Sequence, residues 1–159
     1  MKHLKLFEEI TQYKEGNLKI IYRDNNLTVV VPLTSKSSDI TCRGTGWCSR
    51  GNNYKNWAKD NILFRFLFKD GYKMRLTWKI VGKEYEFSWG SGGEKYFEIY
   101  GPHPFSNIEI MKKNTEYDHN QNIGDDYGEY KTKINLIKKI EMVPEEAKQK
   151  IIEYKKNYE

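Results

Sequence analysis

The chain has 159 residues, 14% of them aromatic, and 27 Lys and Arg against 22 Asp and Glu give it a net charge of +5. This length suits one domain with one hydrophobic core, and the small excess of positive charge argues against a dedicated nucleic-acid-binding domain. Two cysteines exclude a disulfide framework, and without a long apolar segment we expect no membrane association and a cytoplasmic location in a reducing compartment.

The first third of the chain predicts a helix, a hairpin and a long polar loop. Apolar residues recur at helical spacing over residues 3–14, which favours a short amphipathic helix. Strands are expected at 18–23 and 27–33, on either side of a turn of Asp and Asn residues. Residues 32–51 lack sustained periodicity and predict a loop of a length that is often functional. A short helix over 54–60, capped by Asn52 or Asn53, follows it.

Residues 62–89 predict a meander of three antiparallel strands. Phenylalanines alternate along the first strand and share one face: Phe64, Phe66 and Phe68. Burial of that face selects a three-residue loop with Gly71 in the left-handed conformation, because a two-residue loop would place the phenylalanines opposite Lys73 and Arg75.

The next turn, at Gly82 and Lys83, is expected to pair Trp78 with Phe87 and Lys79 with Glu86. The second pairing matters for function, because one strand face carries a basic row that could be mistaken for a phosphate-binding track: Lys73, Arg75, Thr77 and Lys79. Carboxylates on the neighbouring strand would neutralise part of that row.

The remainder predicts one more strand near 95–100, a polar acidic stretch over 114–129, and a segment at 131–143 that fits strand or helix. A final helix begins with Pro144 in its first position and presents one apolar stripe: Ala147, Ile151, Tyr154 and Tyr158. We therefore expect residues 1–159 to form a single α+β domain. Its mostly antiparallel twisted sheet would have roughly five to seven strands, with N- and C-terminal helices packed on it.

The loop over 32–51 is the main candidate binding site. Its Gly, Ser and Thr residues leave backbone N–H groups to meet an anion where the loop enters a helix, and Trp47 is suited to stacking on a base. The candidate ligand-binding residues are Thr34, Lys36, Arg43, Thr45, Trp47, Ser49 and Arg50. No Walker A or G-x-G-x-x-G pattern is present. The alternative is a structural turn in which Trp47 fills the core.

The sequence also contains candidate residues for a reactive cysteine and for a calcium-binding loop. Cys48 lies near arginines that would lower the pKa of its thiol, but no spacing brings a base such as His103 to it, so a cysteine-dependent hydrolase or transferase stays an alternative. Residues 118–129 carry oxygen ligands at the spacing of an EF-hand loop, yet Ile123 stands where the sharp turn requires glycine. A solvated acidic loop is the better interpretation, and we expect neither a metal nor a cofactor.

The segment over residues 27–68 resembles an uncharacterised domain of tailed phages and mobile elements. The resemblance rests on a P-x-T element, formed by Pro32 and Thr34, and on a T-x-W-C-[ST] element over residues 45–49. It implies an accessory factor that binds a host component or a signalling nucleotide, with a role in counter-defence, and it carries over no catalytic residue.

The leading hypothesis is thus a non-enzymatic protein of the host cytoplasm that binds a nucleotide or other phosphate-bearing ligand through the loop. The alternative is a protein-protein interaction module that inhibits a host factor. Its surface would then lie on an exposed sheet face or on the Tyr-rich C-terminal helix.

Overall fold

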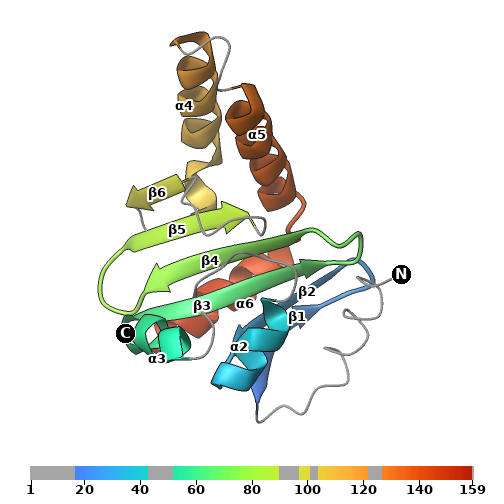
Figure 1. Ribbon diagram of the computed structural model, residues 1–159, viewed down its shortest axis with the longest axis vertical. Helices are drawn as coiled ribbons and strands as arrows, with labels where there is room; N and C mark the ends of the chain where they lie inside the picture. The colour runs from blue at the N-terminus through green and yellow to red at the C-terminus, as the bar shows by residue number, and fades with distance from the viewer. Residues whose placement is uncertain (1–16, 43–51, 90–96, 101–103, 122–126, 159) are drawn as a thin grey trace.

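The computed structural model describes residues 17–42, 52–89, 97–100, 104–121 and 127–158 (Figure 1). The helix expected over 3–14 lies outside these residues. The described elements follow one another as β1 (Leu18–Arg23), β2 (Leu27–Pro32), α2 (Ser35–Thr41), α3 (Asn52–Asp60), β3 (Asn61–Phe68), β4 (Lys73–Lys79), β5 (Glu84–Trp89), β6 (Phe97–Tyr100), η1 (Pro104–Asn107), α4 (Ile108–Gln121), α5 (Tyr127–Glu141) and α6 (Glu145–Lys156).

The strands form one six-stranded antiparallel sheet whose order is the order of the chain, β1 to β6. This confirms the predicted α+β class and the strands expected near 18–23, 27–33, 62–89 and 95–100. Gly71 has φ 95°, as the three-residue loop between β3 and β4 requires, and Phe66 lies opposite Met74.

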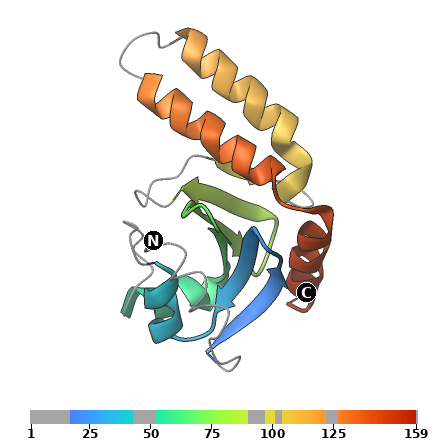
Figure 2. The ribbon, with the colours of Figure 1, turned by 90° about the vertical axis from the view of Figure 1, so that its right-hand side faces the viewer.

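One face of the sheet carries the main hydrophobic core. Phe64, Phe66, Leu76 and Phe87 lie on it fully buried, and Ala147 and Ile151 of α6 pack against them. The stripe of α6 was therefore predicted correctly for Ala147, Ile151 and Tyr154, but Tyr158 is exposed and follows the end of the helix. Pro144 precedes the helix as its N-cap residue instead of occupying its first position. Figures 1 and 2 show α6 on one side of the sheet and α2 on the other.

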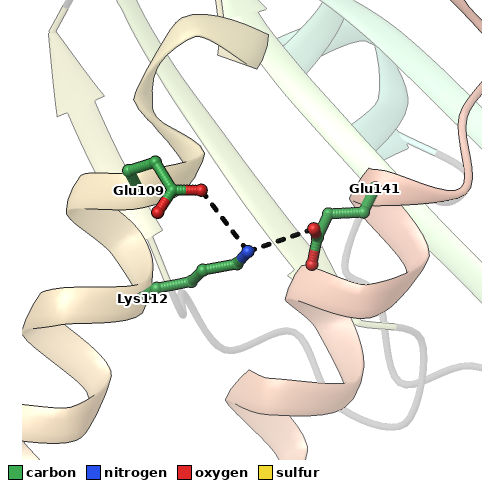
Figure 3. Close-up of polar contacts among 3 residues, drawn as sticks. All are labelled: Glu109, Lys112 and Glu141. Carbon is green, nitrogen blue, oxygen red and sulfur yellow. Dashed lines mark hydrogen bonds and ion pairs between the residues drawn. The ribbon is translucent and has the colours of Figure 1, made fainter.

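Helices α4 and α5 form an antiparallel hairpin that extends beyond the β5–β6 end of the sheet (Figures 1 and 2). Its base joins the core through Met111, Leu136 and Ile140. Lys112 links the two helices there, because its Nζ lies 3.1 Å from Glu141 Oε2 and 3.4 Å from Glu109 Oε1 (Figure 3). The acidic loop expected over 118–129 is wrong for residues 118–121 and 127–129, which are helical.

The register between β4 and β5 also differs from the prediction. Trp78 lies opposite Tyr85 and Leu76 opposite Phe87, a shift of two residues from the expected pairing. Lys79 consequently forms an ion pair with Glu84, at 2.8 Å, and not with Glu86. A shift of two residues keeps every side chain on its face of the sheet, so burial does not distinguish the two registers.

The long loop predicted over 32–51 is interrupted by α2, so the prediction was wrong for residues 35–41. Thr34 is the N-cap of α2: its Oγ1 accepts from Ser37 N at 3.1 Å, and Ser37 Oγ accepts from Thr34 N at 3.1 Å. These reciprocal bonds satisfy two backbone donors at the start of the helix. Helix α3, predicted over 54–60, begins at Asn52.

Candidate functional site

The structure describes two of the seven predicted ligand-binding residues. Thr34 caps α2, and Lys36 is exposed on the same helix. The others, Arg43, Thr45, Trp47, Ser49 and Arg50, lie outside the described residues, as do Cys48 and His103. The direction of the Trp47 ring, the binding role of the loop and the reactivity of Cys48 therefore stay predictions.

The face of the sheet opposite the main core holds a buried polar layer. Arg65 on β3 lies directly opposite Arg75 on β4, and Arg75 lies opposite Ser88 on β5. One row further along the strands, Thr77 lies opposite Glu86. We call the set formed by Arg65, Arg75, Thr77, Glu86 and Ser88 the arginine layer; all five side chains are buried.

Arg75 is held by two polar neighbours on β5. Its Nε donates a hydrogen bond to Ser88 Oγ, and its Nη2 lies 3.5 Å from Glu86 Oε1. Because a guanidinium group presents five donors in a fixed plane, these contacts fix its orientation.

Arg65 is fully buried and lies at the end of α2. The pKa of its guanidinium is lowered to about 10, mainly by burial; the Cys42 thiol acts to raise it, and the positive charge of Arg75 acts to lower it. Its Nη1 donates to the Phe64 carbonyl at 3.4 Å. Cys42 is the C-cap residue of α2, so this helix ends next to the guanidinium.

Helix α2 is tied to this face by apolar and polar contacts. Ile40 packs against a small cluster formed by Leu18, Val30 and Leu67. Lys73 on β4 donates from its Nζ to the Thr41 carbonyl at 3.4 Å, where the helix dipole is negative. The end of α2 is thus fixed over the sheet beside Arg65.

The arginine layer concentrates positive charge. Among the residues that the structure describes, the buried charged side chains of this face are two arginines and one carboxylate, Glu86. The exposed fraction is 0% at Arg65, 5% at Arg75 and 8% at Glu86, so all three charged groups are buried. Charged groups that are out of water and beside a like charge are typical of sites that receive a ligand of opposite charge.

Sequence reasoning missed Arg65, although a signal was available. The three-residue loop between β3 and β4 already placed Arg65 opposite Arg75, because that register also pairs Phe64 with Leu76. The alternation of the phenylalanines drew attention to the apolar face and away from the arginine on the other.

Two other features of the described chain bear on binding chemistry, a cavity and the arrangement of potential metal ligands. A cavity of about 210 Å³ lies between the β1–β2 and β3–β4 turns and the α5–α6 junction. Its carboxylates hold turns: Asp24 Oδ1 accepts from Asn26 N and Leu27 N, and Asp70 Oδ1 accepts from Tyr72 N. In the described part of the chain, no group of His, Cys, Asp or Glu side chains has the arrangement of a metal site.

Across those same residues, no helix combines the length and apolarity needed to cross a membrane. No protein-family model, curated protein or solved structure matches the chain. The functional argument therefore rests on the geometry and charge of the arginine layer.

Proposed function

We propose that this chain is a non-enzymatic binding protein for a phosphate-bearing ligand, specifically a nucleotide, which the arginine layer recognises on the sheet face that carries α2. The observation that carries the proposal is the pair of buried arginines, Arg65 and Arg75, placed directly opposite each other on neighbouring strands. Like charges in that position destabilise a sheet. A ligand with negative charge would offset the repulsion, and a guanidinium group matches the geometry of phosphate oxygens.

The sequence that follows α2 supports the same site. The 43–51 segment contributes Arg43 and Arg50 in sequence and follows directly from Cys42, whose thiol lies beside Arg65. The buried arginines therefore lie next to the residue after which the sequence continues into the segment that it favours for anion binding. The resemblance of residues 27–68 to phage and mobile-element domains extends the proposal to an accessory role in a host cell, including counter-defence.

Thermal unfolding with added ligand tests the proposal. The panel consists of inorganic phosphate, pyrophosphate, and mono-, di- and cyclic nucleotides. A ligand at a hundred times its Kd stabilises a protein by about 2.7 kcal/mol, which raises the Tm of a domain of this size by roughly 5–10 °C. Arg75→Gln should abolish that rise.

Lys138→Gln is the matched control, because it removes one positive charge from an exposed position on α5. The control should keep the full ligand response. The proposal fails if no member of the panel raises the Tm, or if both variants lose the response equally, since the effect would then reflect net charge alone.

A second candidate, a protein-protein interaction module, is favoured by the α4–α5 hairpin. Ile110 and Tyr117 lie two helical turns apart on α4 with 53% and 65% of their surfaces exposed. The C-terminal helix is a weaker candidate, because the Tyr154 ring packs at 5.9 Å from Phe64. Affinity capture from host lysate with the wild type and with an Ile110→Glu/Tyr117→Glu variant tests this function. A partner retained by both proteins would exclude the hairpin as its binding surface.

A further inference from the structure

The cavity of about 210 Å³ opens where the β1–β2 turn, the β3–β4 turn and the α5–α6 junction meet. Its floor is apolar, because Leu27 and Phe68 lie opposite each other on β2 and β3, are buried, and belong to the main hydrophobic core. The cavity therefore lies on the face of the sheet away from the arginine layer. A ligand bound there would be independent of the proposed nucleotide site.

Contacts between the three segments hold the walls of the cavity in place. Lys69 N donates to the Asn26 carbonyl at 2.9 Å, which joins the two turns. Lys139 on α5 pairs through its Nζ with Asp70 Oδ2 and lies over the Phe68 ring, 4.7 Å from the ring centre. The shape of the cavity is thus fixed without a ligand, which reduces the ordering cost of binding.

Two charged side chains at the cavity, Asp24 and Lys69, have no ionic partner. Neither forms an ion pair with the other or with any residue that the structure describes. Asp24 accepts only from neutral donors: Asn26 N and Leu27 N bond to its Oδ1, and the Tyr22 hydroxyl bonds to its Oδ2. Desolvation acts to raise the pKa of Asp24, but these bonds outweigh it, so the carboxylate is ionised at neutral pH. Since each carboxylate oxygen offers about two acceptor sites, Oδ2 can accept one further hydrogen bond.

We infer that the cavity binds a free α-amino acid with an apolar side chain, whose ammonium group lies at Asp24 and whose carboxylate lies at Lys69. A zwitterion supplies a partner for each of the two charges, whereas a ligand of single charge would leave one of them unpaired. The apolar side chain would pack on Leu27 and Phe68 and cover part of Met142, which is 58% exposed. An apolar cavity of about 150 Å³ holds benzene, so the larger volume here admits the side chain of leucine or phenylalanine.

NMR titration of the full chain, followed through its backbone amide signals, tests the inference with phenylalanine and three ligands that each lack one feature. Phenylpropionate has no ammonium group, phenethylamine has no carboxylate, and glycine has no apolar side chain. Phenylalanine should shift the signals of Leu27 and Lys69 with a Kd on the order of 1 mM, as expected for a ligand of about twelve non-hydrogen atoms. Each of the other ligands should bind about tenfold more weakly or less, the value of one hydrogen bond to a charged group.

These ligand comparisons need no variant to fold. Phenylpropionate or phenethylamine that binds as tightly as phenylalanine overturns the inference, since one charge would then be sufficient. Glycine that binds as tightly overturns the role of the apolar floor. Phenylalanine that causes no shift at ten times the expected Kd shows that the cavity is not an amino-acid site.

Two variants assign the charges. Lys69→Gln and Asp24→Asn should each weaken phenylalanine binding about tenfold, and the second keeps an oxygen that accepts from the turn. The matched controls are Lys83→Gln and Asp60→Asn, which change exposed residues at the opposite end of β3 and β4 and should leave the Kd unchanged. Equal weakening by a variant and its control overturns the assignment, since binding would then follow net charge. Arg75→Gln should leave the Kd unchanged, so failure at this cavity is distinguishable from failure of the proposed nucleotide site.

Discussion

Arg65 places a positive charge among apolar neighbours, since Leu63 and Leu67 flank it on the same strand face and both are buried. Exchange of a buried ionic group for an apolar one of similar size is often neutral or stabilising by about 1–4 kcal/mol. We therefore expect Arg65→Met to leave the free energy of unfolding unchanged or to raise it, because it removes the repulsion with Arg75, and to weaken ligand stabilisation. Urea denaturation with and without pyrophosphate measures both effects.

Leu67→Ala provides the comparison for Arg65→Met, since it truncates a buried side chain on the same strand face. It should lower the free energy of unfolding by about 2–5 kcal/mol. A loss of similar size in Arg65→Met would show that the guanidinium stabilises the folded chain without any ligand.

Tyr22 and Asp24 form a bond whose contribution depends on pH. The Tyr22 hydroxyl donates to Asp24 Oδ2 at 2.6 Å, and this hydrogen bond is the main cause that raises the pKa of Tyr22 to about 12. Desolvation acts to raise the pKa of Asp24, but the bonds from Tyr22 and from two backbone N–H groups outweigh it and lower that pKa. The folded state thus holds the tyrosine proton more tightly and the aspartate proton less tightly than the unfolded state.

This pair predicts a loss of stability at both extremes of pH. The Tyr22 contribution is complete below pH about 10, the unfolded value, and disappears as pH rises toward 12. The Asp24 contribution is present above pH about 4 and disappears as pH falls through the lowered pKa of the folded state.

Asp24→Asn should return the pKa of Tyr22 toward 10, measured by carbon-13 NMR of the tyrosine rings, and Asp60→Asn should not. An unchanged Tyr22 titration in Asp24→Asn would contradict this assignment.

At the scale of the elements, α2 depends on its N-cap because it has only seven residues. Thr34→Ala removes a capping side chain, which typically costs about 1 kcal/mol. We expect that loss in urea denaturation, whereas Lys36→Ala, at an exposed position of the same helix, should leave the free energy of unfolding nearly unchanged. If Thr34→Ala left the free energy of unfolding unchanged, packing of Ile40 on the sheet would be sufficient to hold the helix.

The strands were predictable because the apolar residues that alternate along the sequence are the same residues that must be buried on one face of the sheet. Phe64, Phe66 and Phe68 must share a face, and that requirement determined both the β3–β4 register and the role of Gly71. The β4–β5 register was not determined, since both alternatives bury Trp78 and Phe87. The residues of the turn at Gly82 and Lys83 did not distinguish between the two registers.

The helices that sequence reasoning missed lack the usual signals. The cap of α2 uses Ser37 where a capping box normally has Glu or Gln. Helix α4 is mainly polar. It is stabilised by packing against α5 and by burial of Met111, so tertiary contacts and not an apolar pattern determine its helical conformation. The candidate site was predictable only in part: the sequence favoured the loop, but the alternation that buries the phenylalanines gave no sign that Arg65 on the opposite face would also be buried.

At the scale of the whole molecule, the sheet and the hairpin should differ in local stability. β3 and β4 occupy central positions in the sheet with nearly all side chains buried. The far half of the hairpin extends away from the sheet, with Tyr117, Lys131 and other side chains exposed. Hydrogen exchange should therefore be slow in 62–68 and 74–78 and faster in 115–121 and 127–133. Equal protection of both regions would contradict this difference.

The chain-order sheet and the late position of α6 have a consequence for biosynthesis. Each strand pairs with the strand made just before it, so the nascent sheet can grow one hairpin at a time. Its apolar face, however, is covered by α6, which is translated after all six strands. Until that helix emerges, the phenylalanine-rich surface is exposed to other nascent chains. That interval is when a chaperone would be expected to bind.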